Sequence, residues 1–180
     1  VENFGHDKTN MSAGEIDIFP NLLVGKASKN LRRVFYLTDA VRKSARGVSG
    51  IERLHVVGAG VMGGDIAAIG AMAGLDVTLA DMNGAAIKNA ITRAAKLFER
   101  RLKNEDKVAA ALERLRSDPD GHGAADADLV IEAVAEKLDV KQAVFQNLEN
   151  VCKTGAILAT NTSAIPLEDI ATALNTPERL

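Results

Sequence analysis

Residues 51–81 read IERLHVVGAGVMGGDIAAIGAMAGLDVTLAD, and this stretch decides the fold class of the chain. The apolar runs at 51–57 and 77–81 predict two short strands. Between them, a glycine-rich turn leads into residues 61–73, whose apolar side chains predict a helix. Strand, helix and strand in this order form a βαβ unit with two parallel strands.

The turn carries three glycines in the pattern G-x-G-x-x-G, at Gly58, Gly60 and Gly63. In a dinucleotide-binding unit the first permits a tight turn, the second lets a pyrophosphate approach the backbone, and the third lets the helix pack on the sheet. The second strand ends at Asp81, where an acid accepts hydrogen bonds from the adenosine ribose and repels a 2′-phosphate. The unit therefore predicts a site for NAD rather than NADP, and the alternative is a structural domain with coincidental glycines.

Beyond this unit the chain continues to alternate short strands with helices. Residues 128–134 and 156–160 predict two more strands, and the polar residues 117–123 predict a turn region. Helical patterns cover residues 84–103, 138–151 and 167–174. This alternation is typical of an α/β fold of the Rossmann type, a doubly wound parallel sheet with helices on both faces.

The first 50 residues differ in character from the rest. Residues 31–43 place apolar side chains at helical spacing between basic ones, which predicts a helix that packs on a neighbouring surface, and residues 45–50 form a Gly/Ser break. We therefore expect a helical linker or connector segment over residues 1–50 and a dinucleotide-binding domain over residues 51–180.

The composition excludes several classes of function. A formal net charge of −2 argues against a nucleic-acid surface, and no window approaches the roughly 20 apolar residues that span a bilayer. The single cysteine, Cys152, cannot form an intramolecular disulfide and suits a reducing compartment, so we expect a cytoplasmic protein with this thiol buried. No metal site is expected.

Three further segments are more specific than the glycine turn. VVGAGVMGGDIA (56–67), ADLVIEAVAEKLDVK (127–141) and ILATNTSAIPLEDIA (157–171) resemble, in order and spacing, the NAD-binding domain of L-3-hydroxyacyl-CoA dehydrogenases, as does TPERL (176–180). The resemblance covers residues 51–180. It implies oxidation of an L-3-hydroxyacyl-CoA to a 3-ketoacyl-CoA with NAD as hydride acceptor, in fatty-acid β-oxidation.

The first 50 residues are similar in placement to the connector of multifunctional β-oxidation proteins, in which an enoyl-CoA hydratase domain precedes the dehydrogenase. We therefore interpret the chain as a fragment of such a protein. The resemblance implies an acyl-CoA substrate and, for the full-length protein, a homo-oligomer or a multienzyme complex.

The resemblance also implies roles for individual residues at the carboxyl ends of strands. Cofactor contacts are implied for Met62, Ala135, Glu136, Lys141 and Ser163, and substrate contacts for Ser163 and Asn161. Plainer interpretations remain open, since Glu136 and Lys141 could be solvated residues that open a helix, and Ser163 could be the N-cap of the following helix. Glu132 lies inside an apolar strand and needs a partner if it is buried, so we expect a structural role for it.

Hydride transfer from a hydroxyl carbon needs a base to take the hydroxyl proton, and histidine suits that task near neutral pH. None of the three histidines, His6, His55 and His122, is placed for it, and His122 is expected to be exposed. In the family the catalytic histidine follows a segment like TPERL, so we expect it beyond Leu180, together with the helical domain that completes the substrate site. We therefore expect no catalytic residue within the chain, and NAD binding with little or no turnover.

Two other functions remain open. The GAGVMG segment is also similar to the broader group of β-hydroxyacid dehydrogenases, although their NADP-dependent members favour a basic residue after the second strand, where this chain has Met82 and Asn83. A non-catalytic domain that senses NAD is the alternative from another class.

Overall fold

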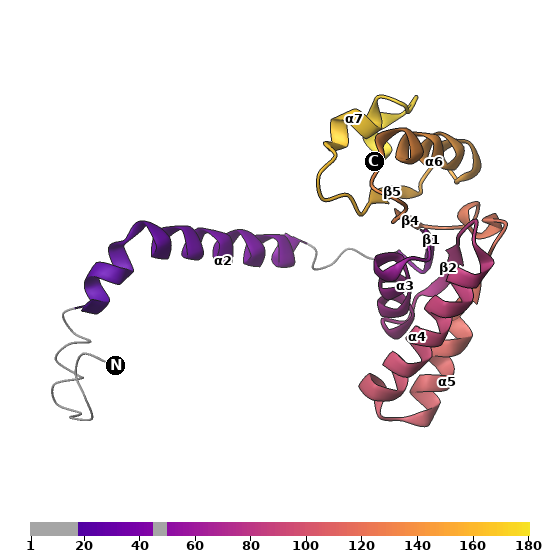
Figure 1. The fold of residues 1–180 in the computed structure, drawn as a ribbon, viewed down its shortest axis with the longest axis horizontal. Helices are drawn as coiled ribbons and strands as arrows, with labels where there is room; N and C mark the ends of the chain where they lie inside the picture. Colours follow the sequence, from indigo (N-terminus) through magenta and orange to yellow (C-terminus); the bar gives the residue numbers. More distant parts are fainter. Residues whose placement is uncertain (1–17, 45–49) are drawn as a thin grey trace. The chain divides into compact units, whose positions relative to one another are not determined.

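The computed structural model describes residues 18–44 and 50–180, which fall into two compact units (Figure 1). The first unit, Val1–Ser49, contains the helix α2 over Lys26–Ser44. This confirms the helix predicted near residues 31–43, which is longer than the pattern indicated.

Residues 18–24 of the first unit are also helical. Apolar side chains of α2, such as Phe35 and Val41, are more than half exposed within this unit. Within residues 18–44 and 50–180, no helix is long and apolar enough to cross a membrane. His6 and the greater part of the predicted Gly/Ser break lie outside the described residues.

The second unit, Gly50–Leu180, is built on one parallel five-stranded sheet in the order β3-β2-β1-β4-β5. Its strands are β1 (Arg53–Val57), β2 (Asp76–Ala80), β3 (Leu115–Ser117), β4 (Leu129–Glu132) and β5 (Ile157–Thr160). The sheet and its helices confirm the predicted α/β fold of the Rossmann type. The direction of the strand order reverses between the neighbours β1 and β4, and in open α/β sheets ligands bind at the carboxyl ends of the strands at such a point.

The connections between strands are mainly helical. They are α3 (Val61–Met72), α4 (Gly84–Leu102), α5 (Glu105–Arg114), α6 (Leu138–Val151) and α7 (Leu167–Ala171), with short 3-10 turns η1 (His122–Ala124) and η2 (Pro177–Arg179). Figure 1 shows α3, α4 and α5 together on one part of the domain, and α6 and α7 together on another.

Alternate residues of the strands face opposite sides of the sheet, and each side has its own core. Leu54 and Val56 of β1 pack in one cluster with α3, α4 and α5, whereas Val57 packs with Val130 of β4 and Leu158 of β5 in a second cluster under α6 and α7. The sheet is therefore doubly wound, with helices on both faces.

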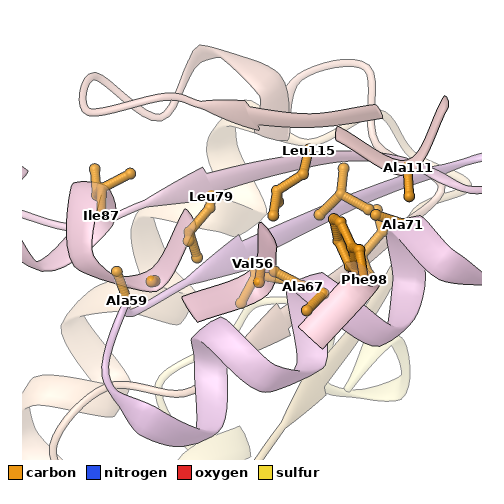
Figure 2. Packing of buried hydrophobic residues seen from close by; sticks show 14 residues of the cluster. Val56, Ala59, Ala67, Ala71, Leu79, Ile87, Phe98, Ala111 and Leu115 are labelled. Carbon is orange, nitrogen blue, oxygen red and sulfur yellow. The ribbon is translucent and has the colours of Figure 1, made fainter. Parts of the chain in front are cut away.

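The first cluster is closed by small side chains on α3 and one large ring on α4. Phe98 is completely buried, and Figure 2 shows it near Ala67 and Ala71 of α3 (Figure 2). Alanine at these positions lets α3 lie close to both the sheet and α4, which holds the glycine turn at the start of α3 against the strands.

Among the elements that the sequence analysis missed are α5 and β3. The predicted helix 84–103 ends at Leu102, where Lys103 adopts a left-handed conformation (φ 49°), and α5 begins after it with Asn104 as its N-cap. The Asn-Glu-Asp run at 104–106 is an N-terminal signal for a helix that could have revealed α5. Strand β3 has only three residues at the sheet edge, which is too short to give a periodic pattern.

Candidate cofactor site

The turn after β1 is shaped by glycines that have no room for a side chain. Gly58 has a φ of +105°, and a Cβ at this residue would lie 2.5 Å from the Ala133 carbonyl oxygen. A Cβ at Gly63 would overlap the Gly58 carbonyl oxygen. Gly58 therefore permits the turn and the close approach to β4, and Gly63 permits the contact of α3 with the turn.

Gly60 has a different reason to be glycine. A Cβ added there would meet no atom within 4 Å, so the space beside it is open. Gly60 is also the N-cap of α3 and gives that helix no side-chain cap, which leaves the first-turn N–H groups available. Uncapped N–H groups at a helix N-terminus favour an anion, so this end of the sheet fits the pyrophosphate of a dinucleotide. Met62 is more than half exposed in the same first turn.

Asp81 follows β2, and its carboxylate links the glycine turn after β1 to the start of the loop after β2. Its Oδ2 accepts a hydrogen bond from the Ala59 N–H at 2.7 Å, and its Oδ1 accepts one from the Asn83 N–H at 2.8 Å. A carboxylate has about four acceptor positions, so each oxygen can accept a further bond from a ribose hydroxyl.

A cavity of about 1030 Å³ brings Gly58, Gly60, Asp81 and Ala135 together. It extends from the carboxyl ends of β1 and β2 along the apolar inner side of α6, which contributes Val140 and other residues. Its size, its carboxylate and the open backbone at Gly60 fit the adenosine and pyrophosphate parts of NAD.

The ends of β4 and β5 carry a second group of polar residues, which is buried. Glu132 and Lys141 are both completely buried, and the Lys141 ammonium lies 2.8 and 2.9 Å from the two Glu132 carboxylate oxygens. The Thr160 hydroxyl of β5 donates to Glu132 Oε2 at 2.6 Å. The structural role expected for Glu132 is thus explained by these partners.

Glu136 joins this group to the loop after β5. Its Oε2 lies 3.2 Å from the Lys141 ammonium, and its Oε1 accepts from the Thr162 hydroxyl at 2.6 Å and from the Ser163 and Ala164 N–H groups at 2.9 and 3.1 Å. The hydrogen bond from the Thr162 hydroxyl and those from the loop amides lower the pKa of Glu136 to about 2. The carboxylate is therefore ionised at neutral pH and fixes the loop.

The structure changes the interpretation of several predicted residues. Lys141 is buried against two carboxylates, so in this structure it bears on a cofactor only through Glu136, and it is not a solvated residue that opens a helix. Ser163 is exposed and is not an N-cap, because α7 begins at Leu167 with Pro166 before it. Asn161 donates its backbone N–H to the Glu132 carbonyl at 2.7 Å, which supports the loop through the backbone rather than the amide side chain.

The two described histidines line the cavity beside the glycine turn and form no hydrogen bond with the loop after β5. His55 is buried on β1, where its Nδ1 lies 2.7 Å from the Thr78 hydroxyl, and burial lowers its pKa. His122 is exposed on η1, as predicted. Cys152 is buried at the end of α6, also as predicted, and burial raises the pKa of its thiol.

Sequence reasoning missed three contributors to the site. The Thr162 hydroxyl donates to Glu136 and accepts from the Ile165 N–H at 3.1 Å, so it organises the loop more than Asn161 does. Thr160 binds Glu132, and the Arg93 guanidinium on α4 donates to the Gly60 carbonyl at 3.1 Å. The hydroxyl residues of ATNTS were a visible signal, whereas no local pattern connects Arg93 to Gly60.

Comparison with known proteins places this geometry in a family. Residues 53–180 match the family model described as "3-hydroxyacyl-CoA dehydrogenase, NAD binding domain". Among curated proteins, the fatty acid oxidation complex subunit alpha of Shewanella baltica strain OS155 is 33% identical over 175 residues, which cover 92% of this chain and 25% of that protein. The chain thus spans about a quarter of the length of the curated relatives it matches.

Solved structures give the same result. A 3-hydroxybutyryl-CoA dehydrogenase from Escherichia coli K12 aligns with a TM-score of 0.70 and 36% identity, over 73% of this chain and 29% of that chain. FadB2 of M. tuberculosis aligns with a TM-score of 0.69 and 38% identity, over 73% of this chain and 48% of that chain.

Proposed function

This chain belongs to the 3-hydroxyacyl-CoA dehydrogenase family as an NAD-binding domain, and we propose that it holds NAD for the oxidation of an L-3-hydroxyacyl-CoA to the 3-ketoacyl-CoA. The observation that carries the proposal is the pairing of two loops at the carboxyl edge of the sheet. The open glycine turn follows β1, and the Ser163 loop, fixed by Glu136, follows β5.

Each half of the cofactor has residues suited to it. The first-turn N–H groups of α3 bind the pyrophosphate at Gly60, and Met62 lies beside it. Asp81 accepts from the adenosine ribose. Glu136 and Ala135, at the end of β4, face the nicotinamide ribose, and Lys141 keeps Glu136 in place.

Bound NAD supplies the acceptor for the hydride that leaves the substrate's 3-carbon. The exposed Ser163 donates a hydrogen bond to the 3-oxygen from a loop whose backbone is already fixed, and Asn161 lies in the same loop. The described histidines form no hydrogen bond with this loop, and we assign none of the described residues as the group that takes the hydroxyl proton.

The relatives support a proposal for the wider setting of the domain. We propose that the full-length protein is a multifunctional fatty-acid β-oxidation enzyme, since the S. baltica relative is a subunit of a fatty acid oxidation complex. Its acyl-CoA substrate, its assembly into an oligomer or complex, and a cytoplasmic location are parts of this proposal.

Calorimetric titration of the 180-residue chain with NAD and NADP tests the cofactor site. The parent chain should prefer NAD, and Asp81→Asn should weaken NAD binding by about tenfold and narrow the preference, because the ribose loses a charged acceptor. Asp76→Asn is the matched control, since Asp76 is exposed at the opposite end of β2. Equal affinity of the parent chain for both cofactors would contradict the ribose assignment.

Turnover is tested separately with NADH and acetoacetyl-CoA. The 180-residue chain should bind NADH and give little or no reduction, because no described histidine contacts the Ser163 loop. Robust reduction, with contaminating enzyme excluded, would show that the base lies within the chain.

A further inference from the structure

We propose that Glu132 is a positioning residue that sets the nicotinamide end of the cofactor site by acting through Lys141 and Glu136 on the Ser163 loop. This inference rests on the proposed function, in which that loop contacts the nicotinamide half of NAD. Glu132 itself is completely buried and cannot touch cofactor or substrate.

The Glu132 carboxylate has no free acceptor position. Oε1 accepts from the Val134 N–H at 2.7 Å and from Lys141, and Oε2 accepts from Lys141 and from the Thr160 hydroxyl. These donors come from the end of β4, from α6 and from β5. One buried side chain therefore fixes the relative position of three elements that surround the loop.

Lys141 connects the buried Glu132 to Glu136, which lies nearer the surface. It lies between Glu132 at 2.8 Å and Glu136 at 3.2 Å, so the two carboxylates share one buried ammonium. Glu136 is the outer member, with its side chain about a third exposed, and its second oxygen holds the loop. A continuous series of charged hydrogen bonds thus runs from the interior of the sheet to the Ser163 backbone.

The loop has few other supports. Among the described residues, every hydrogen bond between residues 161–164 and the chain outside the loop is donated by the loop and accepted by Glu136 Oε1 or by the Glu132 carbonyl. The remaining bonds of Thr162 go to Ile165 within the loop. The position of Ser163 therefore depends on where Glu136 stands, and that depends on Lys141 and Glu132.

A purely structural role does not account for this choice of residues. Buried ion pairs often contribute no more stability than apolar side chains of similar size, because desolvation offsets their attraction. Apolar residues at 132 and 141 could fill this space, but they could not orient a carboxylate at 136. A fully satisfied polar network gives one defined geometry, which a loop that meets a reacting centre requires.

The test separates the two halves of the cofactor. The 180-residue chain is titrated calorimetrically with NAD, ADP-ribose and ADP, so that the NAD to ADP-ribose affinity ratio reports the nicotinamide contacts alone. In Glu132→Gln this ratio should fall by about tenfold, the loss of one to two hydrogen bonds. ADP affinity should stay within about twofold, because the glycine turn and Asp81 are untouched.

A second variant guards against a change of stability alone. Glu132→Gln with Lys141→Met removes both charges, so no buried ion is left unpaired, and it should still lose the nicotinamide contribution. Hydrogen exchange of the 163–165 amides, which donate to Glu136 and Thr162, should be faster in both variants, with the 58–64 amides unchanged.

Glu149→Gln is the matched control, since Glu149 lies on α6, the helix that carries Lys141, and its carboxylate holds a different loop through Asn175 and Thr176. It should keep the parent ratio. If both Glu132 variants keep the parent ratio, the inference is wrong while the proposed function stands. If the parent chain itself binds NAD no better than ADP-ribose, the nicotinamide role of the loop fails and the inference fails with it.

Discussion

The β1–β2 half of the sheet and the β4–β5 half form their parts of the cofactor site by different means. In the first half the turn is built around Gly58, Gly60 and Gly63, and its shape depends on close backbone contacts such as that between Gly58 and Ala133, although Asp81 and Arg93 also bond to its backbone. In the second half the loop is held by side chains, through Glu132, Lys141 and Glu136.

This difference has a physical reason. A pyrophosphate binds backbone N–H groups, so the chain must come close to it and side chains would obstruct. A loop that orients a hydroxyl toward a reacting carbon needs a fixed direction, and directional hydrogen bonds supply that. Substitutions that add a side chain at the glycines should therefore disturb the first half most. Substitutions that remove a charge from the Glu132, Lys141 and Glu136 network should disturb the second half most.

The strongest test of this contrast is Gly63→Ala against Gly60→Ala. The Cβ at 63 would overlap the Gly58 carbonyl, so we expect a loss of at least about 4 kcal/mol in unfolding free energy, together with loss of NAD binding. At Gly60 the Cβ has open space, so stability should stay near the parent value while NAD affinity falls. Denaturant titration and calorimetry measure the two effects, and equal stability losses in both variants would contradict the assignment.

A second test asks whether the two halves unfold together. Phe98 and Phe145 are both completely buried, the first in the cluster with α3, α4 and α5 and the second in the cluster under α6. Replacing either by Ala should cost about 3–5 kcal/mol. If the two halves unfold together, circular dichroism and hydrogen exchange should report the same single transition in each variant, shifted from that of the parent chain.

Two separate transitions in Phe145→Ala would show that the β4–β5 half opens on its own. In that case the charged network would hold its loop only while the β4–β5 half is folded. The two halves would then differ in stability as well as in the way each forms its part of the site.

The smallest expected effect is acid sensitivity at the end of α6. The Thr176 hydroxyl, with the Asn175 and Thr176 backbone N–H groups, lowers the pKa of Glu149 from its ordinary value of 4.5 to about 2. A lowered pKa stabilises the folded state above pH 4.5, and this contribution is lost as the pH falls from 4.5 toward 2.

Glu149→Gln should therefore lower the thermal midpoint at pH 7 and flatten its decline between pH 5 and about pH 2. Glu99→Gln, at an exposed glutamate of α4, is the control and should keep the parent decline. An unchanged decline in Glu149→Gln would assign the acid sensitivity to other carboxylates, among them Glu136, whose pKa is lowered in the same direction.

Much of the first half was predictable from sequence. Glycine spacing is a local property, since each glycine answers a steric demand of the turn itself, and Asp81 lies where the following strand must end. The β4–β5 half was less predictable. The residues were visible in the sequence, but Lys141 and Glu132 are nine positions apart, and only their burial shows that the lysine faces the carboxylate rather than a ligand.

The sequence by itself determined the parallel α/β fold, the position of the dinucleotide turn and the family to which the chain belongs, because these follow from strand periodicity and from short motifs with local causes. Only the tertiary structure decided which partner each buried charge takes, that Ser163 is held by its backbone, and that Arg93 reaches Gly60. Those contacts join residues from different elements, so they depend on how helices pack on the sheet, which no local pattern encodes.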